Sequence, residues 1–352
     1  MKNFAIRLKM ARAMQGWSMQ QLADHMDGSI TKQAIGKYEK GSMQPNVSTF
    51  HALCRILKVR PDFFHRDEEI IINPSFRKRK KLSKTLERSI VERTRDFLER
   101  YLETEELLAI DSTFHMPAMD NSCSSLSDAE KVAEAFRQAM NLGTDPIYNI
   151  IELMEDWGIK VYHESFSTRS ISGLSSTVGE GLHIIVINKD LTVDHQRFTA
   201  MHELGHTIMD FPEGLEENDI EKMCNRFAGA MLIPAEVLRR ELGPHRSRIM
   251  LKELVLINAQ YGVSPQALIY RAKDLNIITQ HVYTSMMKDI SIRFGRGADI
   301  GQYKGKEESN RHFQLLCRGI AQEAFTSSKA ASLYNKTLSS FRKEVMSIET
   351  ND

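Results

Sequence analysis

The sequence predicts a mainly α-helical chain that carries one small antiparallel β-sheet, which is an α+β fold class. Apolar residues recur at helical spacing through most of the 352 residues. Glycine, proline and cap-forming Ser or Thr residues divide these helical stretches. Near the middle of the chain, residues 172–178 and 182–187 instead predict a β-hairpin around Gly179-Glu180-Gly181. A further short strand is expected at residues 159–162.

Length and changes in composition divide the chain into four expected parts. A chain of 352 residues is long enough for two or three domains, each with its own core. We expect an all-α domain at residues 1–65, a basic helical linker at 66–127, a second folded domain at 128–276 and a helical C-terminal extension at 277–352. The second boundary follows from residues 114–127, where Pro, Asn, Asp and repeated Ser indicate a loop.

The first part of the chain predicts several short helices with a basic surface. A helix at residues 4–15 is followed by helices that Ser18 and Thr31 cap, and by a fourth at 47–57. Ten Lys and Arg stand there against four Asp and Glu, although the net charge of the whole chain is only +1. A small basic domain of several helices fits a helix-turn-helix with an anionic partner.

The residues of this domain resemble the Xre and lambda-repressor-like helix-turn-helix family. The resemblance rests on Gln21-Leu22-Ala23, Ile35, Tyr38-Glu39-Lys40-Gly41 and Pro45. It implies that the third helix enters the major groove of an operator in double-stranded DNA, and that the protein binds as a homodimer. The candidate DNA contacts are Gln20, Thr31, Lys32, Gln33 and Lys37. Gln suits adenine edges, and Lys suits guanine edges or phosphate. The alternative is a helical domain that binds another protein.

The linker begins with a run of basic residues, Arg77-Lys78-Arg79-Lys80-Lys81, and continues with apolar residues at helical spacing to about Ile110. We expect a long amphipathic helix there. The basic run is interpreted as a solvated start of this helix in preference to an additional DNA contact. The apolar stripe is interpreted as internal packing or a dimer contact.

The rest of the composition excludes several classes of protein. The four cysteines are far apart and lack paired spacing, so neither a zinc ribbon nor a disulfide framework is indicated. No signal-peptide core and no run of about 18 apolar residues is present. We therefore expect a cytoplasmic protein with no membrane partner.

The most specific pattern in the chain is His202-Glu203-Leu204-Gly205-His206. Two His four residues apart lie on one face of a helix, where both imidazoles can bind one zinc ion, and Glu203 can act as a base toward water. Glu221 on a second helix is the expected third ligand, and Asn225 could hydrogen-bond a ligating imidazole. Three other residues stay open as third ligands: Glu216, Glu217 and His245. A metzincin is excluded, because the third His of that pattern is absent.

The sequence around this motif resembles the ImmA/IrrE family of metallopeptidases over about residues 130–275. Besides the motif and Glu221, the resemblance rests on Arg197-Phe198-Thr199, Asn225-Arg226-Phe227-Ala228, Leu232-Ile233-Pro234 and Tyr261-Gly262-Val263-Ser264. It implies a zincin-like peptidase domain in which His202, His206 and Glu221 bind Zn²⁺ or Mn²⁺ and Glu203 is the catalytic base. Cys224 departs from the family, which often has Ala there, and leaves the metal ligands intact.

Two functions fit these patterns. The first is a DNA-binding transcriptional regulator whose metallopeptidase hydrolyses a peptide bond in a repressor, in a partner or in the chain itself. The alternative is a non-catalytic repressor or antitoxin whose peptidase-like domain senses a ligand or binds a partner protein. In the first case the predicted sheet would hold an extended substrate by strand pairing. His163, His183 and His195 are candidates by residue type for stabilising an oxyanion, and no role is assigned to residues 277–352.

Overall fold

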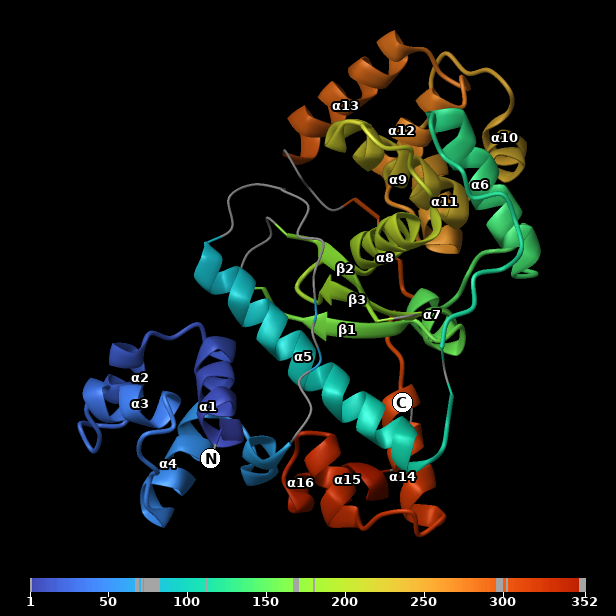
Figure 1. The fold of residues 1–352 in the computed structure, drawn as a ribbon. Coiled ribbons are helices and arrows are strands. Elements are labelled where there is room, and N and C mark those ends of the chain that lie inside the picture. The colour runs from blue at the N-terminus through green and yellow to red at the C-terminus, as the bar shows by residue number, and fades with distance from the viewer. Residues whose placement is uncertain are drawn as a thin grey trace. The chain divides into compact units, whose positions relative to one another are not determined.

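The computed structural model is mainly α-helical with one three-stranded sheet, which confirms the predicted fold class. The residues that it describes are 2–66, 70, 72, 83–111, 113–166, 171–179, 181–295, 300–301 and 303–347. The chain divides into two compact units, whose elements are labelled in Figure 1. The first unit comprises Met1–Asn73, Lys78–Ser112 and Asn310–Asp352, and the second comprises Pro74–Arg77 and Thr113–Ser309.

The first unit begins with the helix-turn-helix elements. These are α1 (Lys2–Met14), α2 (Met19–His25), α3 (Lys32–Glu39), α4 (Val47–Leu57) and the 3-10 helix η1 (Pro61–His65). The predicted caps are present, because the hydroxyls of Ser18 and Thr31 accept hydrogen bonds from backbone N–H groups of α2 and α3. Arg12 joins α1 to α3 through two hydrogen bonds to the carboxylate of Glu39, of 2.6 and 2.9 Å.

The same unit contains α5 and the C-terminal helices. These are α5 (Lys84–Leu107), α14 (Arg311–Ala321), α15 (Ser327–Leu333) and α16 (Leu338–Met346). The predicted basic run, residues 77–81, lies outside the described residues. The predicted helix after it corresponds to α5.

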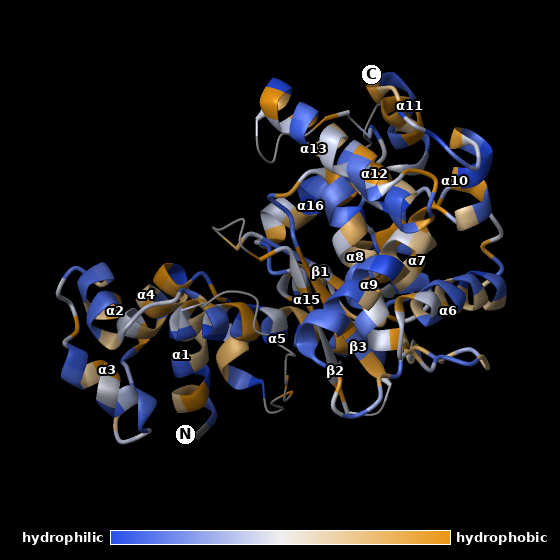
Figure 2. Ribbon diagram, turned by 90° about the horizontal axis from the view of Figure 1, so that it is seen from above, coloured by the Kyte–Doolittle hydropathy of each residue, from blue (hydrophilic) through white to orange (hydrophobic). Residues whose placement is uncertain are grey.

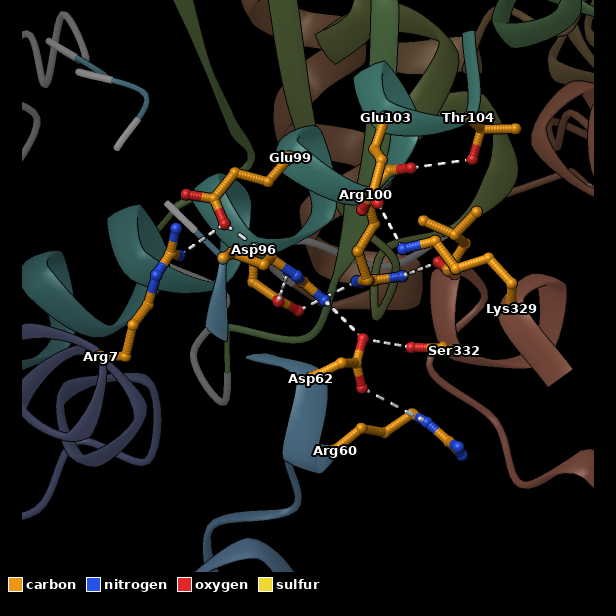
Figure 3. A network of polar contacts seen from close by, with 12 residues as sticks. Arg7, Arg60, Asp62, Asp96, Glu99, Arg100, Glu103, Thr104, Lys329 and Ser332 are labelled. Carbon is orange, nitrogen blue, oxygen red and sulfur yellow. Dashed lines mark hydrogen bonds and ion pairs between the residues drawn. The ribbon is translucent and has the colours of Figure 1, made fainter. Parts of the chain in front are cut away.

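A network of polar contacts attaches the C-terminal helices to α5 and to the helix-turn-helix (Figure 3). Arg100 of α5 donates a hydrogen bond of 2.8 Å to the carbonyl of Leu333. Arg60, just before η1, donates one of 2.8 Å to the carbonyl of Lys336, and Ser332 hydrogen-bonds the carboxylate of Asp62. The C-terminal helices α14, α15 and α16 are therefore part of the unit that holds the helix-turn-helix.

The second unit contains helices on a mixed sheet. Its elements are α6 (Leu126–Ala139), α7 (Ile150–Asp156), β1 (Lys160–Glu164), β2 (Gly173–Val178), β3 (Leu182–Asn188), α8 (Val193–Ile208), α9 (Glu217–Leu232), α10 (Ala235–Leu242), α11 (Leu251–Tyr261), α12 (Pro265–Asp274) and α13 (Gln280–Phe294). The strand order is β1-β3-β2, and β2 and β3 form the predicted antiparallel hairpin. β1 is parallel to β3, so the sheet is mixed where a wholly antiparallel one was expected. β3, rich in Ile and Val and coloured orange in Figure 2, is buried from Ile184 to Asn188.

A buried ion pair extends this unit beyond its predicted end at residue 276. The side chains of Arg197 on α8 and Glu307 are 0% and 1% exposed and pair with each other. Glu307 also accepts a hydrogen bond of 2.8 Å from the backbone N–H of Ile150, at the start of α7. A buried charge such as that of Arg197 needs an opposite charge beside it, so Glu307 is part of the core of the second unit.

The expected extension at 277–352 is therefore shared between the two units. Ile277, Ile278 and Ile290 are buried in the core of the second unit, whereas residues 310–352 belong to the first. Helical periodicity identifies the apolar face of each helix but not the surface that covers it. No helix among the described residues is long and apolar enough to cross a membrane.

Arg7→Met should lower the free energy of unfolding of the first unit by about 3 kcal/mol, because it leaves the buried carboxylate of Glu99 without its nearest cation. Arg7 Nη1 lies 2.6 Å from Glu99 Oε2, and both side chains are buried. Burial raises the pKa of Glu99, against the effect of Arg7, so the charged carboxylate depends on this pairing. Hydrogen exchange of α1 and α5 amides measures the loss.

Lys9→Met is the matched control, since Lys9 is exposed on the same helix, and it should change stability by less than about 0.5 kcal/mol. The double variant Arg7→Met/Glu99→Met should recover most of the stability. Equal loss in the Arg7 and Lys9 variants would show that the pair contributes nothing.

Candidate metal centre and nucleic-acid interface

Close packing of α8 against α9 brings the candidate metal ligands together. The two helices meet at Gly205, the fourth residue of the His-Glu motif. A Cβ atom there would lie 3.1 Å from Cδ1 of Phe227 on α9 and 3.3 Å from Cε of Met209. A larger residue there would press on the Phe227 ring, and Glu221 lies six residues before Phe227 on the same helix.

The ligand atoms of His202, His206 and Glu221 all lie within 4.8 Å of one another. The two Nε2 atoms are 3.2 Å apart, and the carboxylate oxygens of Glu221 lie 3.5 Å from His202 Nε2 and 3.2 Å from His206 Nε2. All three side chains are largely buried. Two imidazole nitrogens and one carboxylate that converge on one point match the donor set of a zinc site with an open fourth position.

The second nitrogen of each imidazole also has a partner on α9. Nδ1 of His202 lies 2.9 Å from Oδ1 of Asn225, and Nδ1 of His206 lies 3.1 Å from Sγ of Cys224. Donation of the Nδ1 hydrogen to these acceptors leaves each Nε2 lone pair directed at the common centre. Asn225 was expected in this role, but Cys224 was not. The spacing of Cys224 could have indicated this contact, because the third and fourth residues after Glu221 lie on the same face of α9 as Glu221.

Glu203 lies beside this group and contacts the sheet. The Ser175 hydroxyl on β2 donates a hydrogen bond of 2.9 Å to Glu203 Oε2, and both residues are buried. β2 approaches α8 closely at Gly173, where a Cβ atom would lie 2.6 Å from Cγ2 of Thr199. No local pattern in the sequence indicated Ser175, because the contact joins residues far apart in the chain.

The other candidates lie apart from the convergent group. Among the described residues, the group that could hold a metal contains neither the alternative third ligands nor the three other His considered above. Glu217 and His245 are exposed, and Glu216 is the N-cap of α9. Burial lowers the pKa of both His163 and His183, which favours their neutral forms. His183 contacts Thr177, with 3.0 Å between Nδ1 and Oγ1.

The candidate DNA contacts are exposed on α2 and α3. Ile35 and Tyr38 of α3 face the core, whereas Lys32, Gln33 and Lys37 face solvent. Gln20 on α2 is also exposed and donates a hydrogen bond of 2.9 Å to Asp24. Thr31 caps α3, so part of its hydrogen-bonding capacity serves the helix itself. Their role as DNA contacts stays a prediction.

The chain matches two family models, one over the helix-turn-helix elements and one over part of the second unit. Residues 8–64 match a family model described as helix-turn-helix, and residues 154–273 match one described as an IrrE N-terminal-like domain of a peptidase family. The chain therefore combines an Xre-type helix-turn-helix domain with an ImmA/IrrE-type domain, which confirms both predicted resemblances.

The chain matches two curated relatives, each over a short part of its length. The chain is 43% identical over 60 residues to the SPbeta prophage-derived uncharacterized HTH-type transcriptional regulator YonR of Bacillus subtilis, covering 17% of this chain and 54% of that protein. It is 35% identical over 68 residues to the radiation response metalloprotease IrrE of Deinococcus deserti, covering 16% of this chain and 24% of that protein. The chain thus spans about half the length of the first relative and about a quarter of the second.

Glu221→Ala should abolish stoichiometric metal binding, because it removes the only carboxylate of the convergent group and leaves two imidazoles to hold the ion. Elemental analysis after dialysis against Zn²⁺ measures occupancy. Glu217→Ala, an exposed change one turn earlier on α9, should retain full occupancy. Unchanged metal content in Glu221→Ala would reassign the third ligand.

Proposed function

We propose that the protein is a DNA-binding transcriptional regulator whose second unit is a zinc-dependent metallo-endopeptidase. The convergence of His202, His206 and Glu221, with Glu203 beside them, carries this proposal. The substrate would be a repressor, another partner protein or the chain itself. The family match to a peptidase domain and the likeness of one segment to a metalloprotease support the reaction class.

The residues of the site have separate tasks in this mechanism. His202, His206 and Glu221 would hold Zn²⁺, or Mn²⁺ in its place. When bound, the ion would polarise the scissile carbonyl and make a water molecule easier to deprotonate. Glu203 would take the proton from that water and deliver it to the leaving amine. Ser175 would hold the Glu203 carboxylate in place through its hydrogen bond.

β2 offers a way to bind the peptide. The strand order gives β2 a partner on one side only among the described strands, namely β3. An extended peptide could therefore pair with the other edge of β2, as in other cases of strand addition. Because Ser175 on β2 contacts Glu203, such a peptide would lie beside the proposed base.

The helix-turn-helix would bind the protein to a specific site on DNA. Because the polar side chains of α3 are exposed, we assign α3 as the helix that would enter the major groove. Gln33 and Lys37 would contact bases or phosphate there. A homodimer on an operator with inverted half-sites, and a cytoplasmic location, complete this proposal.

Glu203→Gln should lower the rate of peptide hydrolysis by about 10²- to 10⁴-fold, because the amide cannot accept the proton from water. The assay follows self-cleavage and cleavage of a library of fluorescence-quenched peptides by the zinc-loaded chain. Metal content must stay at the wild-type level, which separates loss of the base from loss of the ion.

Equal hydrolysis by wild type and Glu203→Gln would reject Glu203 as the base. No hydrolysis by the wild type, together with full repression by Glu203→Gln, would favour the non-catalytic repressor or antitoxin whose second unit senses a ligand or binds a partner.

Gln33→Ala should weaken binding to a duplex selected from a random library by about 1–3 kcal/mol and relax the choice of base at one position. Lys37→Ala should lower the slope of log affinity against log salt by about 1 if Lys37 meets a phosphate. Fluorescence anisotropy measures both. Lys9→Ala, exposed on α1, is the control, and an effect as large as that of Gln33→Ala would argue against α3 as the recognition helix.

A further inference from the structure

A cavity of about 260 Å³ lies next to the candidate metal centre in the second unit. Residues of α8, α9 and α12 line it, together with Val263 just before α12. Neither the three candidate ligands nor Glu203 is among the lining residues, so the cavity is separate from the proposed catalytic cleft. Asn225 connects the two places, because it lines the cavity and its Oδ1 lies 2.9 Å from His202 Nδ1.

The apolar part of the lining suits a ring or a branched chain. Phe198, Val263, Ala267 and Tyr270 contribute carbon surface. Gly229 of α9 also lines the cavity and adds no side chain. A site of this volume with few polar groups takes a small organic molecule in preference to a peptide segment.

The polar part of the lining is richer in hydrogen-bond donors than in acceptors. All three nitrogens of Arg271 donate, to both carboxylate oxygens of Glu130 (3.1 and 2.7 Å) and to the carbonyl of Ile233 (2.7 Å). Asp274 is engaged as well, because its Oδ1 lies 2.9 Å from the ammonium of Lys273.

Asn225 keeps hydrogen-bonding capacity toward the cavity, whereas Arg226 contributes its charge. Arg226 donates through Nη2 to the carbonyl of Asp274 (3.2 Å). Its Nε and Nη1 are buried and are ion-paired with Glu130 and Asp274 at 3.3 and 3.6 Å, without a hydrogen bond among the described residues. The amide nitrogen of Asn225 likewise has no hydrogen bond within the described part of the chain, since only its Oδ1 is used. The Asn225 amide favours a ligand that accepts a hydrogen bond, and the two guanidinium groups against one carboxylate in the lining favour a ligand that carries negative charge.

We propose that this cavity binds a small carboxylic acid with an aromatic or branched aliphatic body, and that binding is coupled to metal affinity through Asn225. The carboxylate accepts a hydrogen bond from the amide of Asn225 and lies near the guanidinium groups of Arg226 and Arg271, while the body packs on Phe198 and Val263. The coupling half rests on the proposed metal function of His202, whereas binding to the cavity does not.

The coupling follows from the two ends of one amide group. A negative acceptor at the Asn225 nitrogen polarises the amide and makes its oxygen a better acceptor for the Nδ1 hydrogen of His202. That hydrogen bond fixes the imidazole and raises its basicity at Nε2, which strengthens metal binding. By linkage, the metal must raise the affinity for the acid by the same factor.

The probe is 3-phenylpropionate, and 3-phenylpropan-1-ol is its uncharged counterpart of similar size. Calorimetry with the metal-free full-length chain should give saturable binding of the acid at least tenfold tighter than that of the alcohol. Competition with a chelator should then show about five- to tenfold tighter Zn²⁺ binding when the acid is present at saturation.

Ala267→Leu fills the cavity and should weaken binding of the acid at least tenfold while Zn²⁺ affinity without the acid stays unchanged. Ala259→Leu makes the same change at an exposed position of α11 and should bind as the wild type does. Gly229→Ala adds one methyl group to the α9 wall, 3.4 Å from Arg271 Cδ, and should weaken binding by a smaller factor.

Three outcomes would contradict binding of an acid in this cavity. They are no saturable binding to the wild type, equal affinity for acid and alcohol, and full binding by Ala267→Leu. Equal Zn²⁺ affinity with and without the acid would overturn the coupling. Because no step measures hydrolysis, these outcomes stand apart from a failure of the peptidase proposal.

Discussion

The candidate site depends on how closely α8 and α9 approach each other. A metal ligand set drawn from two helices is useful only if the helices hold a fixed separation and rotation, since zinc ligands tolerate errors of a few tenths of an ångström. Gly205 against Phe227 sets this separation. The contacts of Asn225 and Cys224 then fix the rotation of the imidazoles, because both residues lie on the face of α9 that carries Glu221.

Much of this site follows from local spacing. Two His four residues apart share a helix face in any α-helix, and Asn225 is one turn from Glu221, so the sequence could predict these neighbours. The choice of Glu221 over Glu216 and Glu217 depends on where α9 begins and how it is rotated, which local spacing does not determine. Ser175 shows the same limit, since its contact with Glu203 depends on the packing of the sheet against α8.

The fold likewise has features that local sequence predicts and features that depend on long-range contacts. Caps such as Ser18 and Thr31 act within four residues, and the helices they start were predicted. The direction of β1 and the assignment of residues 310–352 to the first unit depend on surfaces distant in sequence. Arg197 illustrates the difficulty, because local sequence does not indicate that its charge is buried against Glu307, which lies 110 residues further along the chain.

The order of the two units along the chain has a consequence for the fate of a cleaved molecule. The second unit, apart from Pro74–Arg77, is continuous from Thr113 to Ser309, and parts of the first unit precede and follow it. A single break in that interval would give two polypeptides that each retain helices of the first unit. Arg100, Arg60 and Asp62 would still bind the far fragment without a covalent link. Cleavage of the peptide bond would therefore not separate the two fragments at once. They would stay associated through these contacts and dissociate after dilution.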